Sequence, residues 1–240
     1  MPSGRRQFLQ RLTMGSLAVG ALPRSLAAAE SAGESQRNEI AELEVLRHEA
    51  QQPASPSFDV TWADKLTAKY RAVFDVPVTA GGAGVMRAGL WTNHYRDVLK
   101  AQPSDMNAVI VIRHEAIPFI MNHEFWERYD IAKGVKERHP MTGKKTKRNI
   151  VLMTAEEDGL PPMFAALSLH KQMEHGAIVL ACNMAFGQLV GMVAKKENLK
   201  GAEARTKALS YMVPGVILQP NGIFGVTLAQ QHGAAFVQAT

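Results

Sequence analysis

The stretch Ala108-Val-Ile-Val-Ile112 decides the fold of this chain. It is an uninterrupted apolar run of strand length, which is typical of a strand covered by helices on both faces. A second run, Ala177-Ile-Val-Leu-Ala181, has the same length and character. Strands that are apolar at every position belong to buried, parallel sheets. The two runs therefore predict the centre of an α/β domain.

Further strand-length and helix-length patterns flank these two runs. We expect additional strands in residues 69–76, 213–218 and 234–237, and helices in residues 85–100, 118–128, 161–175, 184–197, 202–211 and 222–231. Strands that alternate with helices of this length imply right-handed crossovers. The sequence predicts a single doubly wound α/β domain, with a mainly parallel sheet of about five strands and helices on both faces.

The first 29 residues resemble an export signal. The run Arg5-Arg6-Gln7-Phe8-Leu9 resembles the twin-arginine motif, and Gly4 stands where that motif usually has serine or threonine. The apolar stretch 12–22 is about eleven residues long, too short for a hydrocarbon core of roughly 30 Å. Ala27-Ala28-Ala29 supplies small residues for cleavage. We expect a periplasmic protein with no transmembrane segment after cleavage; the alternative is an amphipathic helix at a membrane surface.

The rest of the chain divides into an extension and a domain. Residues 30–58 are charged, then rich in Gln, Pro and Ser, as expected of an extension and linker with at most one short helix at 38–50. Residues 59–240 form the α/β domain. Within it, residues 128–153 lose the alternating pattern and become polar and basic, which indicates an excursion from the sheet.

Charge and composition exclude some partners. The formal charge is +5, but four arginines lie in the leader, so the remaining chain carries about +1 and a nucleic-acid partner is not expected. The basic cluster Lys144-Lys145-Thr146-Lys147-Arg148 has no interleaved aromatic residue and is typical of a solvated loop; the alternative is a phosphate-binding patch. The glycines of Gly81-Gly82-Ala83-Gly84 lack the lysine and serine of a phosphate loop, so no nucleotide site is expected.

Cys182 is the only cysteine, so no disulfide can form within the chain. It lies where a predicted strand hands over to a helix, beside free backbone N–H groups and the positive end of the helix. That position stabilises a thiolate. The alternative is a buried cysteine that acts as a small apolar residue.

Other polar residues also follow predicted strands. His114 and Glu115 come directly after residues 108–112, Asn183 follows Cys182, and Asn221 follows residues 213–218. In parallel sheets, ligands bind outside the carboxyl ends of the strands, so we expect these side chains at one edge.

The histidines do not predict a metal site. The chain has no HExxH or CxxC spacing, and His170 and His175 are five residues apart, so they do not share a helical face. A metal or haem site built on His114 is an alternative that this pattern leaves open.

Three motifs together carry a family resemblance: VIVIRHEA at 109–116, IVLACN at 178–183 and VPGVIL at 213–218. Their order and spacing resemble the DsrE/DsrF-like family of sulfur-relay proteins over residues 70–237. The resemblance implies that Cys182 is similar to the cysteine that accepts sulfur as a persulfide and passes it on. It also implies that His114 and Glu115 match a polar pair after the second strand, and that the chain assembles as a homo-oligomer.

These observations favour a periplasmic protein that binds or relays a small sulfur species. Cys182 would be the nucleophile and His114 its general base. Glu115, Asn183 and Asn221 would shape the pocket. The alternative is a non-catalytic, oligomeric module that holds a metal or a cofactor such as haem in the same pocket. The sequence names no cofactor and leaves open whether the protein is an enzyme.

Overall fold

The structure is a computed structural model that describes residues 57–240. The expected leader and the extension up to residue 56, including the short helix at 38–50, lie outside the described residues. A short 3₁₀ helix, η1 (Ala63–Lys65), precedes the first strand. No helix within residues 57–240 has the length and apolar character needed to cross a membrane.

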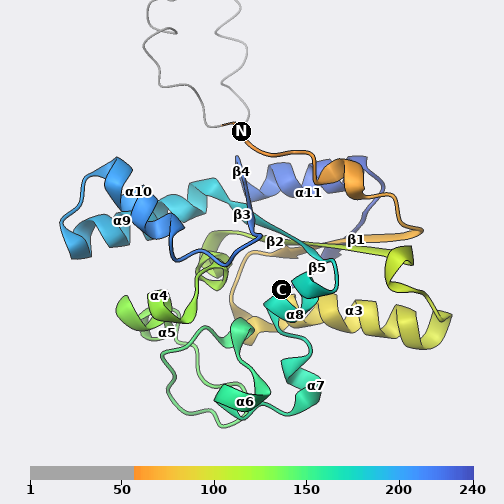
Figure 1. Ribbon diagram of the computed structural model, residues 1–240, viewed down its shortest axis with the longest axis horizontal. Coiled ribbons are helices and arrows are strands. Elements are labelled where there is room, and N and C mark those ends of the chain that lie inside the picture. The colour runs from red at the N-terminus through yellow and green to blue at the C-terminus, as the bar shows by residue number, and fades with distance from the viewer. Residues whose placement is uncertain (1–56) are drawn as a thin grey trace, which may run out of the picture. The chain divides into compact units, whose positions relative to one another are not determined.

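The domain is built on a single five-stranded sheet in which every pair of neighbouring strands is parallel (Figure 1). Its strands are β1 (Tyr70–Val76), β2 (Met106–Ile112), β3 (Ile178–Cys182), β4 (Ile217–Gln219) and β5 (Ala235–Gln238), in the order β4-β3-β2-β1-β5. The predicted parallel α/β sheet is therefore confirmed. The apolar stretch that decided the fold forms β2, the central strand.

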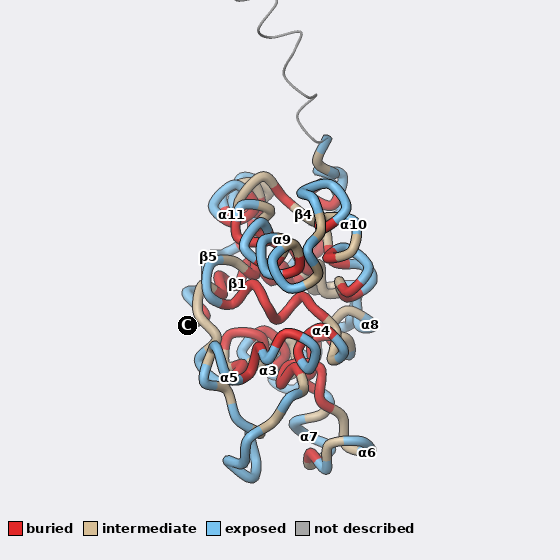
Figure 2. Tube along the Cα trace, turned by 90° about the vertical axis from the view of Figure 1, so that its left-hand side faces the viewer, coloured by how far each residue is buried: buried red, intermediate tan, exposed pale blue. Residues whose placement is uncertain are grey.

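The sheet is wound in two directions. From β1 to β4 the chain moves steadily one way across the sheet, and then it returns to place β5 beside β1. The return passes through α11 (Gly222–Gln231), which covers one face, whereas α3 (Ala83–Leu99) covers the other (Figure 1). Figure 2 shows buried β1 between these two helices. This is the doubly wound arrangement expected for right-handed crossovers.

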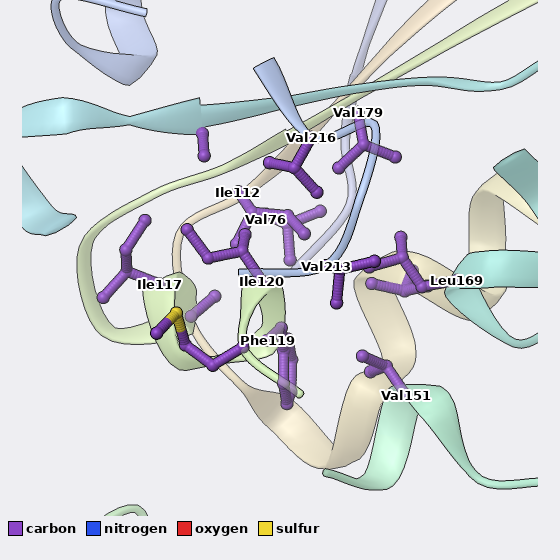
Figure 3. Close-up of a cluster of buried hydrophobic side chains, with 14 of the residues drawn as sticks. Val76, Ile112, Ile117, Phe119, Ile120, Val151, Leu169, Val179, Val213 and Val216 are labelled. Atoms are coloured by element: carbon purple, nitrogen blue, oxygen red, sulfur yellow. The ribbon is translucent and has the colours of Figure 1, made fainter. Parts of the chain in front are cut away.

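Two apolar cores lie on the two faces of the sheet. Val109 and Val111 of β2 pack with Trp62 under α11, whereas Ile110 and Ile112 pack on the α3 side. Each such buried side chain stabilises the fold by about 1.5–3 kcal/mol. Figure 3 shows the α3-side core, where Ile112 and its strand neighbours meet apolar side chains from the segment after β2. Because both faces are covered, β2 is apolar at nearly every position.

The remaining helices complete the two layers and the connections. They are η2 (Ala80–Gly82), η3 (Pro103–Asp105), η4 (His114–Ile120), α4 (His123–Arg128), α5 (Ile131–Gly134), η5 (Ile150–Leu152), α6 (Ala155–Asp158), α7 (Pro162–Ala165), α8 (Leu169–Glu174), α9 (Asn183–Glu197) and α10 (Gly201–Leu209). The helices expected at 85–100, 184–197, 202–211 and 222–231 are present as α3, α9, α10 and α11.

Two expected helices are broken. Residues 118–128 divide into the end of η4, which contains Pro118, and α4, which begins after Asn122 in extended conformation. Residues 161–175 divide into α7 and α8 because Ser168 is extended, with ψ of 153°. At 118–128 the helical spacing arises from two short segments that face the same core, whereas α7 has no buried residue and only its Ala165 packs against the core.

The predicted excursion at 128–153 is only partly polar. Residues 138 and 145 form an isolated antiparallel bridge in an exposed basic loop. The end of the segment returns to the core, where η5 is buried. Buried Asn149 donates from Nδ2 to the carbonyls of Phe119 and Met121 at 2.9 and 2.7 Å, and so fixes the end of η4.

Candidate functional site

The carboxyl ends of the strands meet at one edge of the sheet, as the parallel pairing requires. Ile112 pairs with Ala181, and Cys182 pairs with Gln219. Arg113 follows Ile112 and therefore lies level with Cys182. The edge carries a row of polar groups across β2, β3 and β4.

The row lies at a topological switch point. The helix after β3 is α9, whose Phe186 and Leu189 belong to the core on the α3 side. The helix after β4 is α11, on the opposite face. Neighbouring strands whose helices depart to opposite faces leave a crevice at their carboxyl ends, where α/β proteins bind ligands.

Cys182 is the N-cap residue of α9. Its Sγ accepts a hydrogen bond from the Ala185 N–H at 3.4 Å. The residue is 7% exposed. The sulfur therefore lies at the positive end of a 15-residue helix and contacts one of its free N–H groups.

Arg113 brings a fixed positive charge to this edge. Its Nε and Nη2 donate to the two carboxylate oxygens of Asp75 at 2.7 and 2.8 Å. The hydrogen bond that Arg113 donates to Asp75 raises the pKa of Arg113 against the opposing effect of burial, and the charges of Asp75 and Cys182 raise it further. The guanidinium is thus held by one carboxylate and close enough to Cys182 to interact with a thiolate there.

Arg205 adds a second cation beside Asn183, the residue that follows Cys182. Its Nη2 donates to Asn183 Oδ1 at 2.7 Å, and its guanidinium carbon lies 5.3 Å from the centre of the Phe186 ring. The Asn183 oxygen is therefore engaged, and its side chain is oriented by an arginine from α10. Cation–π contact with Phe186 keeps the guanidinium over the first turn of α9.

Asn221 and Gly222 place the N-terminus of α11 against the same edge. Asn221 Oδ1 accepts the Phe224 N–H at 2.8 Å, so this side chain caps its own helix. A Cβ at Gly222 would lie 2.5 Å from Cδ of Arg113. Only glycine lets α11 approach Arg113 this closely.

Gln219 supplies a buried acceptor in the row. Its Nε2 donates to the Asp59 carbonyl at 2.7 Å, and the residue is fully buried. Within residues 57–240, its Oε1 has no hydrogen-bond partner. A buried acceptor without a partner is unfavourable unless a ligand, a water or a thiol donates to it.

His114 and Glu115 lie at the same edge but line a separate cavity of about 550 Å³, together with Tyr129, Lys136 and Gln188. His114 has a left-handed backbone with φ of 52°, which is uncommon for a residue other than glycine and concentrates at functional sites. No hydrogen bond joins His114 to Cys182 in the described part of the chain. The structure thus groups Cys182, Asn183 and Asn221, and leaves His114 and Glu115 in the neighbouring cavity.

Tyr129 forms a rigid wall of that cavity. Its hydroxyl donates to Glu197, which Arg128 also contacts through Nε at 2.8 Å. Burial first, and then the hydrogen bond with Glu197, raise the pKa of Tyr129 to about 12. Tyr129 is therefore a neutral donor at neutral pH.

Three side chains elsewhere lie at the spacing of metal ligands, but their carboxylates are already paired with an arginine. Ligand atoms of His123, Glu157 and Asp158 lie within 4.8 Å of one another. However, Arg148 forms ion pairs with both carboxylates, and His123 Nδ1 accepts the Asn149 N–H at 3.1 Å. Burial first, and then the charge of Arg148, lower the pKa of His123. The cluster is an ion-pair network that braces the loop after α4.

Comparison with protein-family models, curated proteins and solved structures gives no match. The geometry of this edge and the sequence resemblance are therefore the observations that bear on function.

Sequence reasoning missed the two arginines and Asp75. Arg113 could have been found, because it directly follows the central strand, where the strand-end rule directs attention. Asp75 was hidden inside an apolar strand pattern, and Arg205 lies 22 residues beyond the asparagine it contacts.

Proposed function

We propose that this protein binds a small sulfur species at Cys182 and passes it on as a persulfide. One observation carries the proposal: the only thiol of the chain caps a helix at the switch point of a parallel sheet, level with the guanidinium of Arg113. Helix N-termini and adjacent cations stabilise thiolates. The sequence resemblance to sulfur-relay proteins supports the same conclusion.

The transfer step is a thiol exchange at sulfur. The Cys182 thiolate attacks the outer sulfur of a small persulfide, R–S–SH. A new S–S bond forms on Cys182, the old S–S bond breaks, and RS⁻ leaves. RS⁻ takes up the proton that the Cys182 thiol released, so the products are Cys182–S–SH and R–SH, with no external oxidant or reductant.

The neighbouring residues have distinct tasks in this step. Arg113 stabilises negative charge on the attacking and the accepted sulfur. Arg205 orients Asn183, the residue that follows Cys182. His114 stays the candidate general base, and in that role its side chain must turn from the neighbouring cavity toward Cys182.

Mass spectrometry of the full-length protein tests the proposal. After incubation with glutathione persulfide, the intact mass should rise by about one sulfur atom per chain, and the Cys182→Ser variant should gain none. Arg113→Met should slow the gain, whereas Arg138→Met, at an exposed position in the basic loop, should not. No gain in the unaltered protein would refute the relay.

The second candidate function is cofactor binding in the cavity that His114 lines. Its volume of about 550 Å³ and the left-handed His114 favour it. The absorption spectrum of protein purified from native cells separates the two functions. A visible band that His114→Ala abolishes would support a cofactor such as haem, whereas a spectrum without visible absorption supports the sulfur site.

We further propose that the chain acts in the periplasm after twin-arginine export and, as the sequence resemblance implies, as a homo-oligomer. The support is the Arg5-Arg6 motif and the alanines that precede Glu30. Replacing both arginines by lysine should trap the precursor inside the cell, and the mature protein should begin near Glu30. Efficient export of the double variant would contradict the twin-arginine route.

A further inference from the structure

A second cavity lies at the opposite edge of the sheet, where the strands begin. It has a volume of about 530 Å³ and is lined by α3, by the start of β2, and by α8 with the residues that lead into β3. None of the residues discussed for sulfur chemistry lines it. Its volume falls in the range of small-molecule sites.

Gln172 supplies a hydrogen-bond acceptor to this cavity. The residue is 6% exposed, and its Nε2 donates to the carbonyls of Val85 and Leu167 at 2.8 and 2.7 Å. These two bonds fix the orientation of the amide and leave Oε1 without a protein donor. Because Gln172 lines the cavity, this oxygen is the acceptor that its side chain can offer a ligand there. A ligand with an N–H or O–H group would satisfy it.

The walls next to Gln172 are small. Gly89, Ala108, Ala166 and Ala177 offer no more than a Cβ. At Gly89 a Cβ would lie 2.7 Å from Leu167 Cδ2 and 3.2 Å from Gln172 Cδ, so the helix packs directly on the segment that carries the acceptor. Flat walls of this kind fit a planar ring, which buries a large apolar area for its volume.

The cavity also carries one cation and one anion. Arg96 pairs with Asp97 at 3.0 Å and Glu174 pairs with Lys171 at 2.7 Å, all with exposed side chains. The hydrogen bond from Lys171 lowers the pKa of Glu174, which keeps it ionised. Surface pairs of this kind contribute little, so each charge can turn to a ligand at small cost.

We propose that this cavity binds a free aromatic α-amino acid whose ring carries a hydrogen-bond donor. The ring N–H or O–H donates to Gln172 Oε1, and the ring lies against Ala108 and Ala177. The ligand's carboxylate pairs with Arg96 and its ammonium with Glu174. This assignment uses the open acceptor and both charges, and it does not depend on the chemistry of Cys182.

Calorimetric titration of the full-length protein with L-tryptophan tests the proposal. Three analogues each remove one contact: L-phenylalanine lacks the ring donor, tryptamine lacks the carboxylate, and indole-3-propionate lacks the ammonium. Each should bind about tenfold more weakly than tryptophan, the factor that one hydrogen bond or ion pair of about 1.4 kcal/mol supplies. No binding of tryptophan at millimolar concentration, or equal binding of the analogues, would overturn the proposal.

Two variants locate the site. Ala108→Val fills the cavity floor and should abolish binding, whereas Ala72→Val makes the same change at the position paired with Ala108 on β1, outside the cavity. Arg96→Gln, at an exposed position, should weaken tryptophan about tenfold and leave tryptamine unchanged. Equal affinity in Ala108→Val and Ala72→Val would place binding elsewhere. If Ala108→Val does not fold, Arg96→Gln decides: a loss shared by tryptamine contradicts the assigned carboxylate contact.

Discussion

The two ends of the parallel strands differ in how their polar groups are held. We call the end where the strands finish the carboxyl edge and the end where they begin the amino edge. At the carboxyl edge, Asp75 and Arg113 form a partly buried double hydrogen bond, and Arg205 fixes Asn183. At the amino edge, Arg96 and Glu174 sit in exposed pairs around a cavity with an open acceptor. Charges held in place by buried partners suit a site that stabilises a reacting sulfur. Charges in weak, exposed pairs can turn to a ligand, which suits reversible binding in a cavity.

The direction of the chain explains this difference. At the carboxyl edge, β3 and β4 each lead into the N-terminus of a helix, so free N–H groups gather there. Cys182 and Asn221 both act as N-caps at these junctions. At the amino edge, α8 ends at Glu174, three residues before Ala177 leads into β3, so helix C-termini and loops surround the cavity instead.

The largest expected effect is on the ion pair of the carboxyl edge. Arg113→Met leaves the Asp75 carboxylate, 10% exposed, without its partner. Breaking a buried pair costs about 3–5 kcal/mol. Since Arg113 is partly exposed, we expect the free energy of unfolding, measured in urea, to fall by about 2–4 kcal/mol. Arg96→Gln at the amino edge should cost less than about 0.5 kcal/mol. Equal losses in the two variants would remove the contrast between the edges.

A smaller effect is expected where α11 meets Arg113. Gly222→Ala places a Cβ 2.5 Å from Arg113 Cδ and should destabilise the protein by about 1–3 kcal/mol. Gly191→Ala, in α9 with no atom within 4 Å of its Cβ, should instead stabilise it by about 0.5–1 kcal/mol. Thermal unfolding of both variants measures the difference. A Gly222→Ala protein as stable as Gly191→Ala would show that α11 does not press on Arg113.

The smallest effect concerns the hydrogen bond between His123 and Asn149. His123 accepts the N–H of Asn149, which in turn fixes the end of η4. Burial, with Arg148 second, lowers the pKa of His123 below 6.5. As the pH falls below about 6.5, the unfolded chain therefore takes up a proton that the folded chain does not, and stability decreases until the folded pKa is passed.

Urea unfolding between pH 7 and pH 5 measures this dependence. His123→Gln should reduce the decline of stability with falling pH relative to the unaltered protein. The same slope in the two proteins would show that His123 does not titrate with folding.

The sequence predicts the sheet well because its information there is local. Runs such as residues 108–112 are apolar on both faces, and only a covered parallel strand requires that. The strand-end rule also led to Cys182 and Asn221. The broken helix at 161–175 was missed because both short segments carry apolar residues, and the break lies in residues 166–168, where Ser168 is extended.

The partners within the sites could not be predicted in the same way. The distance in sequence from Asp75 to Arg113 is 38 residues, and from Gln172 to Val85 it is 87. Such pairs form only when the sheet register and helix packing are fixed. His114 is a similar case. The strand order correctly places it at the same end of the sheet as Cys182, but its side chain lines a different cavity.

Alkylation of Cys182 in the folded protein tests the central claim most directly. At about pH 6, iodoacetamide should modify native Cys182 faster than it modifies glutathione, because Arg113 and the α9 N-terminus stabilise the thiolate. Arg113→Met should slow the reaction, and His114→Ala should slow it as well if that histidine acts as the base. If native Cys182 resists iodoacetamide until urea unfolds the chain, it is a core residue, and the sulfur-relay account is contradicted.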